Sequence, residues 1–234
     1  MPRDINQAGL LDTKKLEETS FAIIGAGAIG SFYCMTLSKM GAKLITVYDD
    51  DSIEIHNVNN QLYPIRYVGT DKVSALENVA FAFGECKITK IKARWAPENA
   101  VNADVIITAV DNMDTRIAMW NHYKGKTKFF LDGRMGAQVY YVYGIDVTDT
   151  KAVEMYNNSL YPQFEAMPDR CGQKSIIYTV LQVSAQMLSQ TKRWLMGEYR
   201  PAEVVYDALH DEITKRYTME RDVSKMEVME EEEV

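Results

Sequence analysis

Residues 21–48 constrain the fold more than any other part of this chain. A short apolar run ends in a glycine-rich turn at 25–30, a helical stretch follows, and a second apolar run leads to Asp49. Glycines at this spacing let the backbone turn tightly between a buried strand and a helix, and let it approach a phosphate closely. The segment therefore predicts a strand–helix–strand unit that binds a nucleotide phosphate at the helix N-terminus. Asp49 would accept hydrogen bonds from ribose hydroxyls.

Strands and helices are predicted to alternate up to about residue 135. We expect strands at 20–24, 43–48, 87–95, 104–110 and 128–131, and helices at 27–40, 72–83 and 114–123. This order predicts a doubly wound, mostly parallel α/β sheet with right-handed crossovers. After residue 133 we expect an alternating strand at 138–147, a long loop at 148–170, a helix at 175–196, and a hairpin formed by 203–209 and 212–219.

One domain accounts for nearly all of the chain. The nucleotide-binding half is expected at about 20–135 of a single domain over 1–226, with antiparallel C-terminal strands extending its sheet. The last residues, 227–234, are glutamate-rich and predict an acidic disordered tail.

Composition and charge disfavour several classes of protein. The chain has 234 residues, of which 47% are hydrophobic and 25% charged, as in ordinary globular proteins. Part of the net charge of −7 lies in the tail, and a mildly acidic body disfavours binding to nucleic acid. The chain contains no run of 18 apolar residues, and its start is polar, so we expect neither a membrane span nor a signal peptide. The three cysteines are widely spaced and form no Cys-x-x-Cys pair, which predicts a cytoplasmic protein without disulfides or structural zinc.

Polar residues after the second and fourth predicted strands distinguish between nucleotides. Asn57, Asn60, Gln61 and Lys72 follow the second strand, and Asp111 ends the fourth. Chemistry at the α-phosphate of ATP needs cations, amide donors and a metal-binding carboxylate, because negative charge accumulates there. An NAD-dependent dehydrogenase needs neither the amide-rich segment nor the lysine. The carboxyl ends of parallel strands form one ligand-binding edge, so this set favours ATP with Mg²⁺.

The ordered motifs resemble those of the ThiF-type family, which includes MoeB-like bacterial adenylyltransferases and the adenylation domains of ubiquitin-activating enzymes. The motifs are Gly-x-Gly-x-x-Gly-Ser at 25–31, Asp-x-Asp at 49–51, an asparagine-rich segment at 57–61, Gly-x-x-Lys at 69–72 and Asp-Asn-x-x-x-Arg at 111–116. The resemblance spans residues 20–220 and implies a Rossmann-like fold. It also implies an ATP-dependent adenylyltransferase that joins a carboxylate to the α-phosphate. The carboxylate would usually be the C-terminus of a small ubiquitin-like or sulfur-carrier protein.

The resemblance assigns roles to individual residues. Lys72 would bind the phosphates, Asp111 would hold Mg²⁺, and Arg116 would anchor its helix. Family members are commonly homodimers in which an N-terminal arginine enters the neighbouring site, and Arg3 is the candidate here, although a disordered terminus is the alternative. The residues expected to bind ATP are Gly25, Gly27, Ala28, Ile29, Gly30, Asp49, Asp51, Asn57, Asn60, Gln61, Lys72 and Asn112.

Asn60 stands where the family has an arginine, so a phosphate-binding cation is replaced by a neutral amide. Our hypothesis is that Arg66 or Arg134 supplies the missing charge in catalysis. The substitution also leaves open a non-catalytic scaffold that pairs with an active partner. An NAD-dependent oxidoreductase and a tRNA-modifying dehydratase of the same superfamily are two further hypotheses.

Cys171 precedes the predicted helix at 175–196 and lies between Arg170 and Lys174 in a positively charged segment. A helix N-terminus and nearby cations stabilise a thiolate, so Cys171 is a candidate nucleophile for a thioester intermediate. The alternative is that Cys171 is a small, partly buried structural residue.

Overall fold

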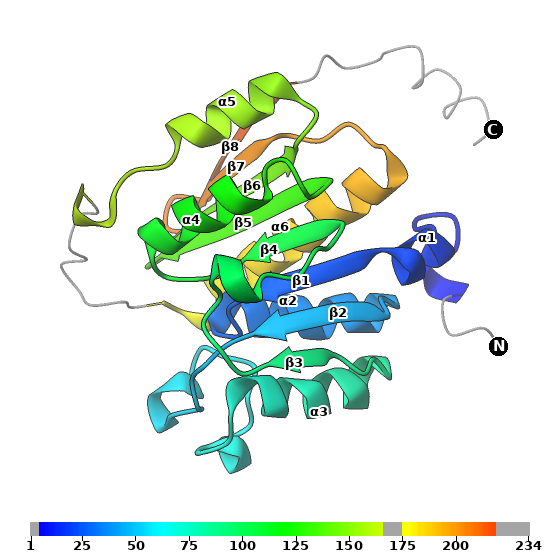
Figure 1. Ribbon diagram of the computed structural model, residues 1–234, viewed down its shortest axis with the longest axis vertical. Coiled ribbons are helices and arrows are strands. Elements are labelled where there is room, and N and C mark those ends of the chain that lie inside the picture. The colour runs from blue at the N-terminus through cyan, green and yellow to red at the C-terminus, as the bar shows by residue number, and fades with distance from the viewer. Residues whose placement is uncertain (1–4, 166–174, 219–234) are drawn as a thin grey trace.

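A computed structural model describes residues 5–165 and 175–218 and shows a mixed sheet between two layers of helices (Figure 1). The strands are β1 Ser20–Ile24, β2 Leu44–Tyr48, β3 Thr89–Ile91, β4 Val105–Thr108, β5 Phe129–Gly136, β6 Val139–Asp146, β7 Glu203–Asp207 and β8 Glu212–Arg216. The α-helices are α1 Thr13–Glu18, α2 Ala28–Met40, α3 Lys72–Gly84, α4 Met113–Tyr123, α5 Thr150–Asn158 and α6 Ile177–Met196. Short 3-10 helices lie at Ile5–Gln7, Ile55–Asn57, Ile65–Tyr67, Pro97–Asn99 and Gln163–Glu165.

The eight strands form a single sheet in the order β3-β2-β1-β4-β5-β6-β7-β8. All pairs from β3 to β5 are parallel, and all pairs from β5 to β8 are antiparallel. The predicted fold class, a doubly wound and mostly parallel sheet with antiparallel C-terminal strands, is confirmed. The strand order reverses at β1, because β2 and β3 follow on one side of it and β4 and β5 on the other. Such a switch point opens a crevice at the carboxyl ends of the strands.

Two separate apolar clusters form the core, one on each face of the sheet. The first packs α2, α3 and α6 against side chains such as Ile23, Ile107 and Leu131. The second packs α4 and α5 against the alternate positions, including Ile24 and Phe130. Strands buried on both faces are nearly continuously apolar, which is why β1 and β4 were recognisable in the sequence.

Three predicted boundaries differ from the structure. The predicted strand at 87–95 pairs only over β3, and the strand predicted to end at residue 131 continues to Gly136. Gly133 interrupts the apolar pattern because a Cβ there would lie 2.5 Å from Met187 Sδ, where α6 packs against β5. The loop predicted at 148–170 contains α5, which begins at its N-cap Asp149. This helix buries only Ala152 and Tyr156, too few positions for a clear helical period.

The predicted C-terminal hairpin is confirmed, with Asp211 in the left-handed conformation at its turn. Among the described residues, no helix has the length and apolar content that crossing a lipid bilayer requires.

Candidate nucleotide-binding site

The glycine-rich turn joins β1 to α2, and two of its three glycines are required by the protein's own packing. Gly25 has a φ of 97°, and a Cβ there would lie 2.5 Å from the carbonyl oxygen of Ala109. A Cβ on Gly30 would lie 1.9 Å from the carbonyl oxygen of Gly25. At Gly27, by contrast, a Cβ would meet none of the described atoms within 4 Å.

Gly27 is therefore the position that leaves open space in front of α2. It is the N-cap of this helix, whose first turn contains Ala28 and Ile29. The N–H groups of a first helical turn have no partner one turn back, so they point toward whatever occupies this space. These N–H groups and the positive end of the helix dipole favour an anion at this position.

Asp49 follows β2 and closes the turn from the side. Its Oδ2 accepts from the Ala26 amide at 2.7 Å, and its Oδ1 accepts from the Asp51 amide at 2.9 Å. Burial raises the pKa of Asp49, although the Lys72 charge and the two amides oppose the shift. A carboxylate with two lone-pair sites on each oxygen retains acceptor capacity for hydroxyl groups.

Lys72 is the first residue of α3 and lies against these carboxylates. Its Nζ is 2.7 Å from Asp51 Oδ2 and 3.9 Å from Asp49 Oδ1, and only 9% of its side chain is exposed. The backbone of Lys72 is held too, because its amide donates to the Asp51 carbonyl at 3.0 Å. The structure thus brings the predicted residues Asp49, Asp51 and Lys72 into one cluster.

The corner between β4 and α4 lies beside the glycine-rich turn. Ile24 pairs with Thr108, and the Ala109 amide donates to the Ile24 carbonyl at 2.9 Å. Asp111 is exposed at this corner, two residues beyond Ala109. The predicted ligand Asn112 caps α4, because its Oδ1 accepts from the Thr115 amide at 2.9 Å.

Gln163 also holds this corner, and sequence analysis did not identify it. Its side-chain Oε1 accepts from the backbone amide of Met113 at 2.7 Å, while its backbone amide donates to Asp114 Oδ1 at 2.9 Å. The contact spans 50 residues of sequence, and Gln163 belongs to none of the recognised motifs.

Two side chains of the asparagine-rich segment form hydrogen bonds with other residues of the protein. Asn57 Oδ1 accepts from the Glu54 amide at 2.9 Å, and Asn60 Nδ2 donates to Ser175 Oγ at 2.6 Å. Asn60 thereby ties this loop to the residues that precede α6. Gln61 Oε1 is shielded from solvent and has no hydrogen-bond partner within the described part of the chain.

The two arginines proposed to replace the family's cation lie in different surroundings. Arg66 is exposed, with its guanidinium 5.2 Å from the ring centre of Tyr67. Arg134 is held by Asp132, with Nε 2.6 Å from Oδ2. The structure adds a third cation at this edge, because Arg94 Nε lies 3.1 Å from Asp50 Oδ2.

Arg116 anchors α4, as predicted. Its Nε lies 3.0 Å from Asp132 Oδ1, so the Asp132 side chain, which is 0% exposed, is bound by two arginines. Tyr156 adds a hydrogen bond to Asp132 Oδ2 at 3.0 Å. Burial alone would raise the pKa of Asp132, but the charges of Arg116 and Arg134 outweigh it and lower that pKa below its ordinary value.

Several candidates lie outside the described residues, namely Cys171, Arg3 and the acidic tail. Cys34 and Cys86 are buried free thiols, and burial raises the pKa of both, so neither is a reactive thiolate.

The oxygen-rich donor set suits a hard cation bound together with phosphate. The ligand atoms of Asp49, Asp50 and Asp51 lie within 4.8 Å of one another, and Asp111 lies at the β4–α4 corner beside the same glycine-rich turn.

Comparisons with known proteins bear on the family and the fold. A model of the ThiF family matches residues 1–227. Adenylyltransferase and sulfurtransferase MOCS3-1 of Zea mays is 29% identical over 114 residues, which are 46% of this chain and 24% of that protein. tRNA threonylcarbamoyladenosine dehydratase 2 of Saccharomyces cerevisiae is 28% identical over 122 residues, 47% of this chain and 27% of that protein. Ubiquitin-like modifier-activating enzyme 5 of Gallus gallus is 26% identical over 125 residues, 46% of this chain and 32% of that protein.

Each match covers only about a quarter to a third of the curated relative's own length. Two solved structures share the fold over most of this chain. PaaA superimposes with a TM-score of 0.71 at 15% identity, covering 89% of this chain and 67% of that one. MccB of E. coli with ATP superimposes with a TM-score of 0.68 at 12% identity, covering 90% of this chain and 67% of that one.

Proposed function

Because the chain belongs to the ThiF family, we propose that it is an ATP-dependent adenylyltransferase. A carboxylate oxygen attacks the α-phosphate of ATP, the α–β phosphoanhydride bond breaks, and the products are an acyl-adenylate and pyrophosphate. One observation carries the proposal. The open space at Gly27, the acceptor Asp49 and the buried ammonium of Lys72 meet at one edge of the sheet. That set supplies an anion site, a hydroxyl site and a cation, which are the three recognition elements of a nucleoside triphosphate.

The chain's residues divide the work of binding. The first turn of α2 receives phosphate oxygens, and the Asp49 carboxylate orients the ribose. Lys72 is held by Asp51 and Asp49, so its ammonium needs only to turn toward the phosphates to stabilise charge developing at the α-phosphate. Asp111 would hold Mg²⁺ through its carboxylate, and the ion would neutralise phosphate charge during attack by the acyl carboxylate.

The acyl substrate we propose is the C-terminus of a small ubiquitin-like or sulfur-carrier protein. The names of two relatives support this class: an adenylyltransferase and sulfurtransferase, and a ubiquitin-like modifier-activating enzyme. We further propose a homodimer, with Cys171 as acceptor if a thioester follows the adenylate. A dehydratase acting on tRNA is the alternative suggested by a third relative.

Nucleotide titration tests the core of the proposal. We expect Mg²⁺·ATP to bind by calorimetry, whereas NAD produces no saturable heat. Lys72→Met should weaken the binding of ATP by about tenfold to a hundredfold, since a hydrogen bond to a charged group contributes roughly 1.5–3 kcal/mol. Lys92→Met is the matched control, because Lys92 pairs with Asp71 at 2.8 Å on the exposed surface. Unchanged ATP affinity in Lys72→Met, or binding of NAD in place of ATP, would refute the proposal.

A non-catalytic scaffold is the second candidate, favoured by Asn60 and by its hydrogen bond to Ser175. Pyrophosphate exchange in the presence of the acyl substrate separates the two. An adenylyltransferase exchanges label into ATP, and a scaffold binds ATP without exchange. Arg66→Ala tests whether that arginine supplies the cation missing at residue 60. Pyrophosphate exchange at the wild-type rate in this variant would rule out that role for Arg66.

A further inference from the structure

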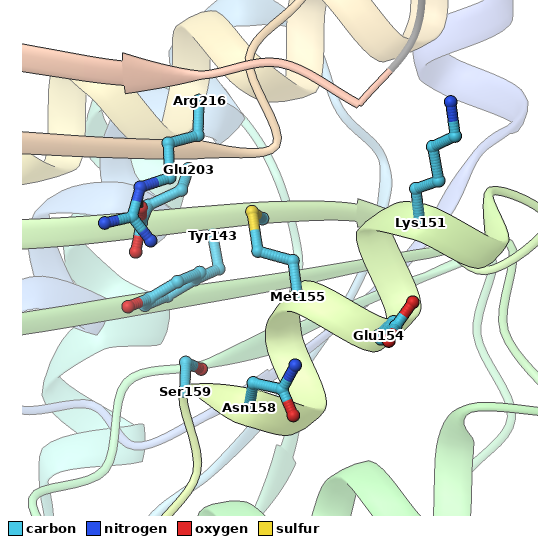
Figure 2. Close-up of a pocket in the computed structure, with 8 residues that line it drawn as sticks. All are labelled: Tyr143, Lys151, Glu154, Met155, Asn158, Ser159, Glu203 and Arg216. Carbon is cyan, nitrogen blue, oxygen red and sulfur yellow. Dashed lines mark ion pairs between the residues drawn. The ribbon is translucent and has the colours of Figure 1, made fainter.

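A hollow of about 480 Å³ lies between α5 and the antiparallel strands, away from the glycine-rich turn (Figure 2). Tyr143 of β6, Glu203 of β7 and Arg216 of β8 line it from the sheet, and Lys151 and Met155 line it from α5. The three strand residues are direct cross-strand partners, so their side chains stand side by side on one face of the sheet.

Glu203 is the unusual member of this set. Its side chain is only 7% exposed, and its charged neighbour is Arg216, whose Nε lies 3.1 Å from Glu203 Oε2. The Arg216 side chain is 66% exposed, and Oε2 makes no hydrogen bond of acceptable geometry within the described residues. The Tyr143 hydroxyl also interacts with the Glu203 carboxylate. Arg216 is nevertheless its charged partner, and a mostly solvated cation compensates a buried carboxylate poorly.

The rest of the hollow is fixed in place and partly apolar. The guanidinium of Arg134 lies 4.5 Å from the ring centre of Tyr143 and donates to the Ser159 carbonyl at 2.9 Å. Figure 2 shows Met155 reaching from α5 toward the Tyr143 and Glu203 side chains. An aromatic ring and a thioether beside a buried carboxylate complement a long alkyl stem that ends in a cation.

We propose that this hollow binds an arginine or lysine side chain of a partner polypeptide, whose cation replaces Arg216 on Glu203. The polypeptide would lie on the adjacent open part of the same face, where Tyr141 is 39% exposed beside its cross-strand partner Val205. Arg216 occupies the position until the partner arrives and then turns into solvent at little cost.

The site stands apart from the proposed adenylation chemistry but within reach of it. Thr108, Asp132, Tyr143 and Glu203 are successive cross-strand partners along one row of the sheet. Three strand spacings separate Glu203 from the end of β4, roughly 14 Å. Binding of a basic side chain can be measured without nucleotide, so the outcome does not depend on whether adenylation occurs.

A methyl NMR titration tests the proposal on the whole chain. N-acetyl-arginine amide should shift the Met155 methyl resonance, identified with Met155→Leu, in a saturable manner, and the neutral isostere N-acetyl-citrulline amide should not. Arg216→Ala removes the competing cation and should tighten the arginine probe about threefold to tenfold. Glu203→Gln should abolish saturation. Lys215→Ala, on the opposite face of β8, is the control and should bind as wild type does.

Three results would overturn the proposal. These are an equal shift with the citrulline probe, no saturation in Arg216→Ala, or unchanged affinity in folded Glu203→Gln. Because Arg216 is largely exposed, Arg216→Ala keeps the test decisive even if Glu203→Gln does not fold.

Discussion

Asp49 and Asp132 are both largely buried carboxylates near the carboxyl edge of the parallel strands, but their surroundings differ. Asp132 is 0% exposed and is held by Arg116, Arg134 and Tyr156, all from its own chain. Asp49 is 10% exposed and accepts two backbone amides, with Lys72 at 3.9 Å. One centre is closed by two arginines from α4 and β5 and by a tyrosine from α5, whereas the other opens on the space in front of α2.

The comparison shows which buried charges suit a ligand and which are structural. A carboxylate that accepts from two arginines and a tyrosine and is shielded from solvent cannot be reached by a ligand. A carboxylate held by backbone amides keeps its position and still has acceptor capacity. The opposite pKa shifts follow, because two arginines stabilise ionised Asp132 while burial disfavours ionised Asp49.

Removing the charge of Asp132 should have the largest effect. Asp132→Asn leaves two buried arginines without their counter-ion, so we expect a loss of about 3–5 kcal/mol in the free energy of unfolding. Urea denaturation measures it, with Asp50→Asn as the exposed control, since Asp50 pairs only at the surface with Arg94. A loss below about 1 kcal/mol would mean that the Asp132 centre is not structural.

Two glycine substitutions sharpen the distinction between packing and ligand binding. Gly30→Ala should destabilise the fold by about 1–3 kcal/mol or more, because its Cβ would collide with the Gly25 carbonyl oxygen. Gly27→Ala should leave stability nearly unchanged, yet weaken ATP about tenfold by filling the space in front of α2. Thermal unfolding and ATP calorimetry on both variants provide the readouts. If Gly27→Ala bound ATP normally, the phosphate would not lie at this position.

The pH dependence of stability should have opposite signs at the two centres. The folded-state pKa of Asp132 is lowered, so its contribution is present above about pH 3.9 and is lost as pH falls through the folded value. The folded-state pKa of Asp49 is raised, so the folded state keeps its proton longer, and stability falls as pH rises from about 3.9 through the folded value. This is the smallest effect that we expect.

Urea unfolding from pH 3 upward, compared between wild type and each asparagine variant, measures both slopes. In Asp132→Asn, the decrease in the free energy of unfolding toward acidic pH should disappear. In Asp49→Asn, the decrease in the free energy of unfolding toward neutral pH should disappear. Slopes of the same sign would contradict the assigned surroundings of the two carboxylates.

The parallel half of the sheet could largely be predicted, because its signals are local. Buried strands such as β1 and β4 are continuously apolar, the glycine-rich turn and Asp49 directly follow predicted strands, and Lys72 begins the helix predicted at 72–83. The sheet then places these residues together, since parallel strands end at one edge. Arg116 was predictable too, because it belongs to a recognisable motif, and its contact with Asp132 confirms that it anchors its helix.

The second half of the molecule was less predictable, because its signals depend on distant contacts. The helix α5 buries two side chains, and at Gly133 of β5 a Cβ would crowd Met187 of α6. Gln163 reaches Met113 across 50 residues, and Arg134 is engaged by Asp132. The sequence alone determined the alternation of strands and helices and the order of polar residues along them, because apolar periodicity and turn chemistry act over a few residues. Only the tertiary structure decided which charges neutralise one another and which remain available, because desolvation and charge pairing depend on what the rest of the chain places within a few ångströms.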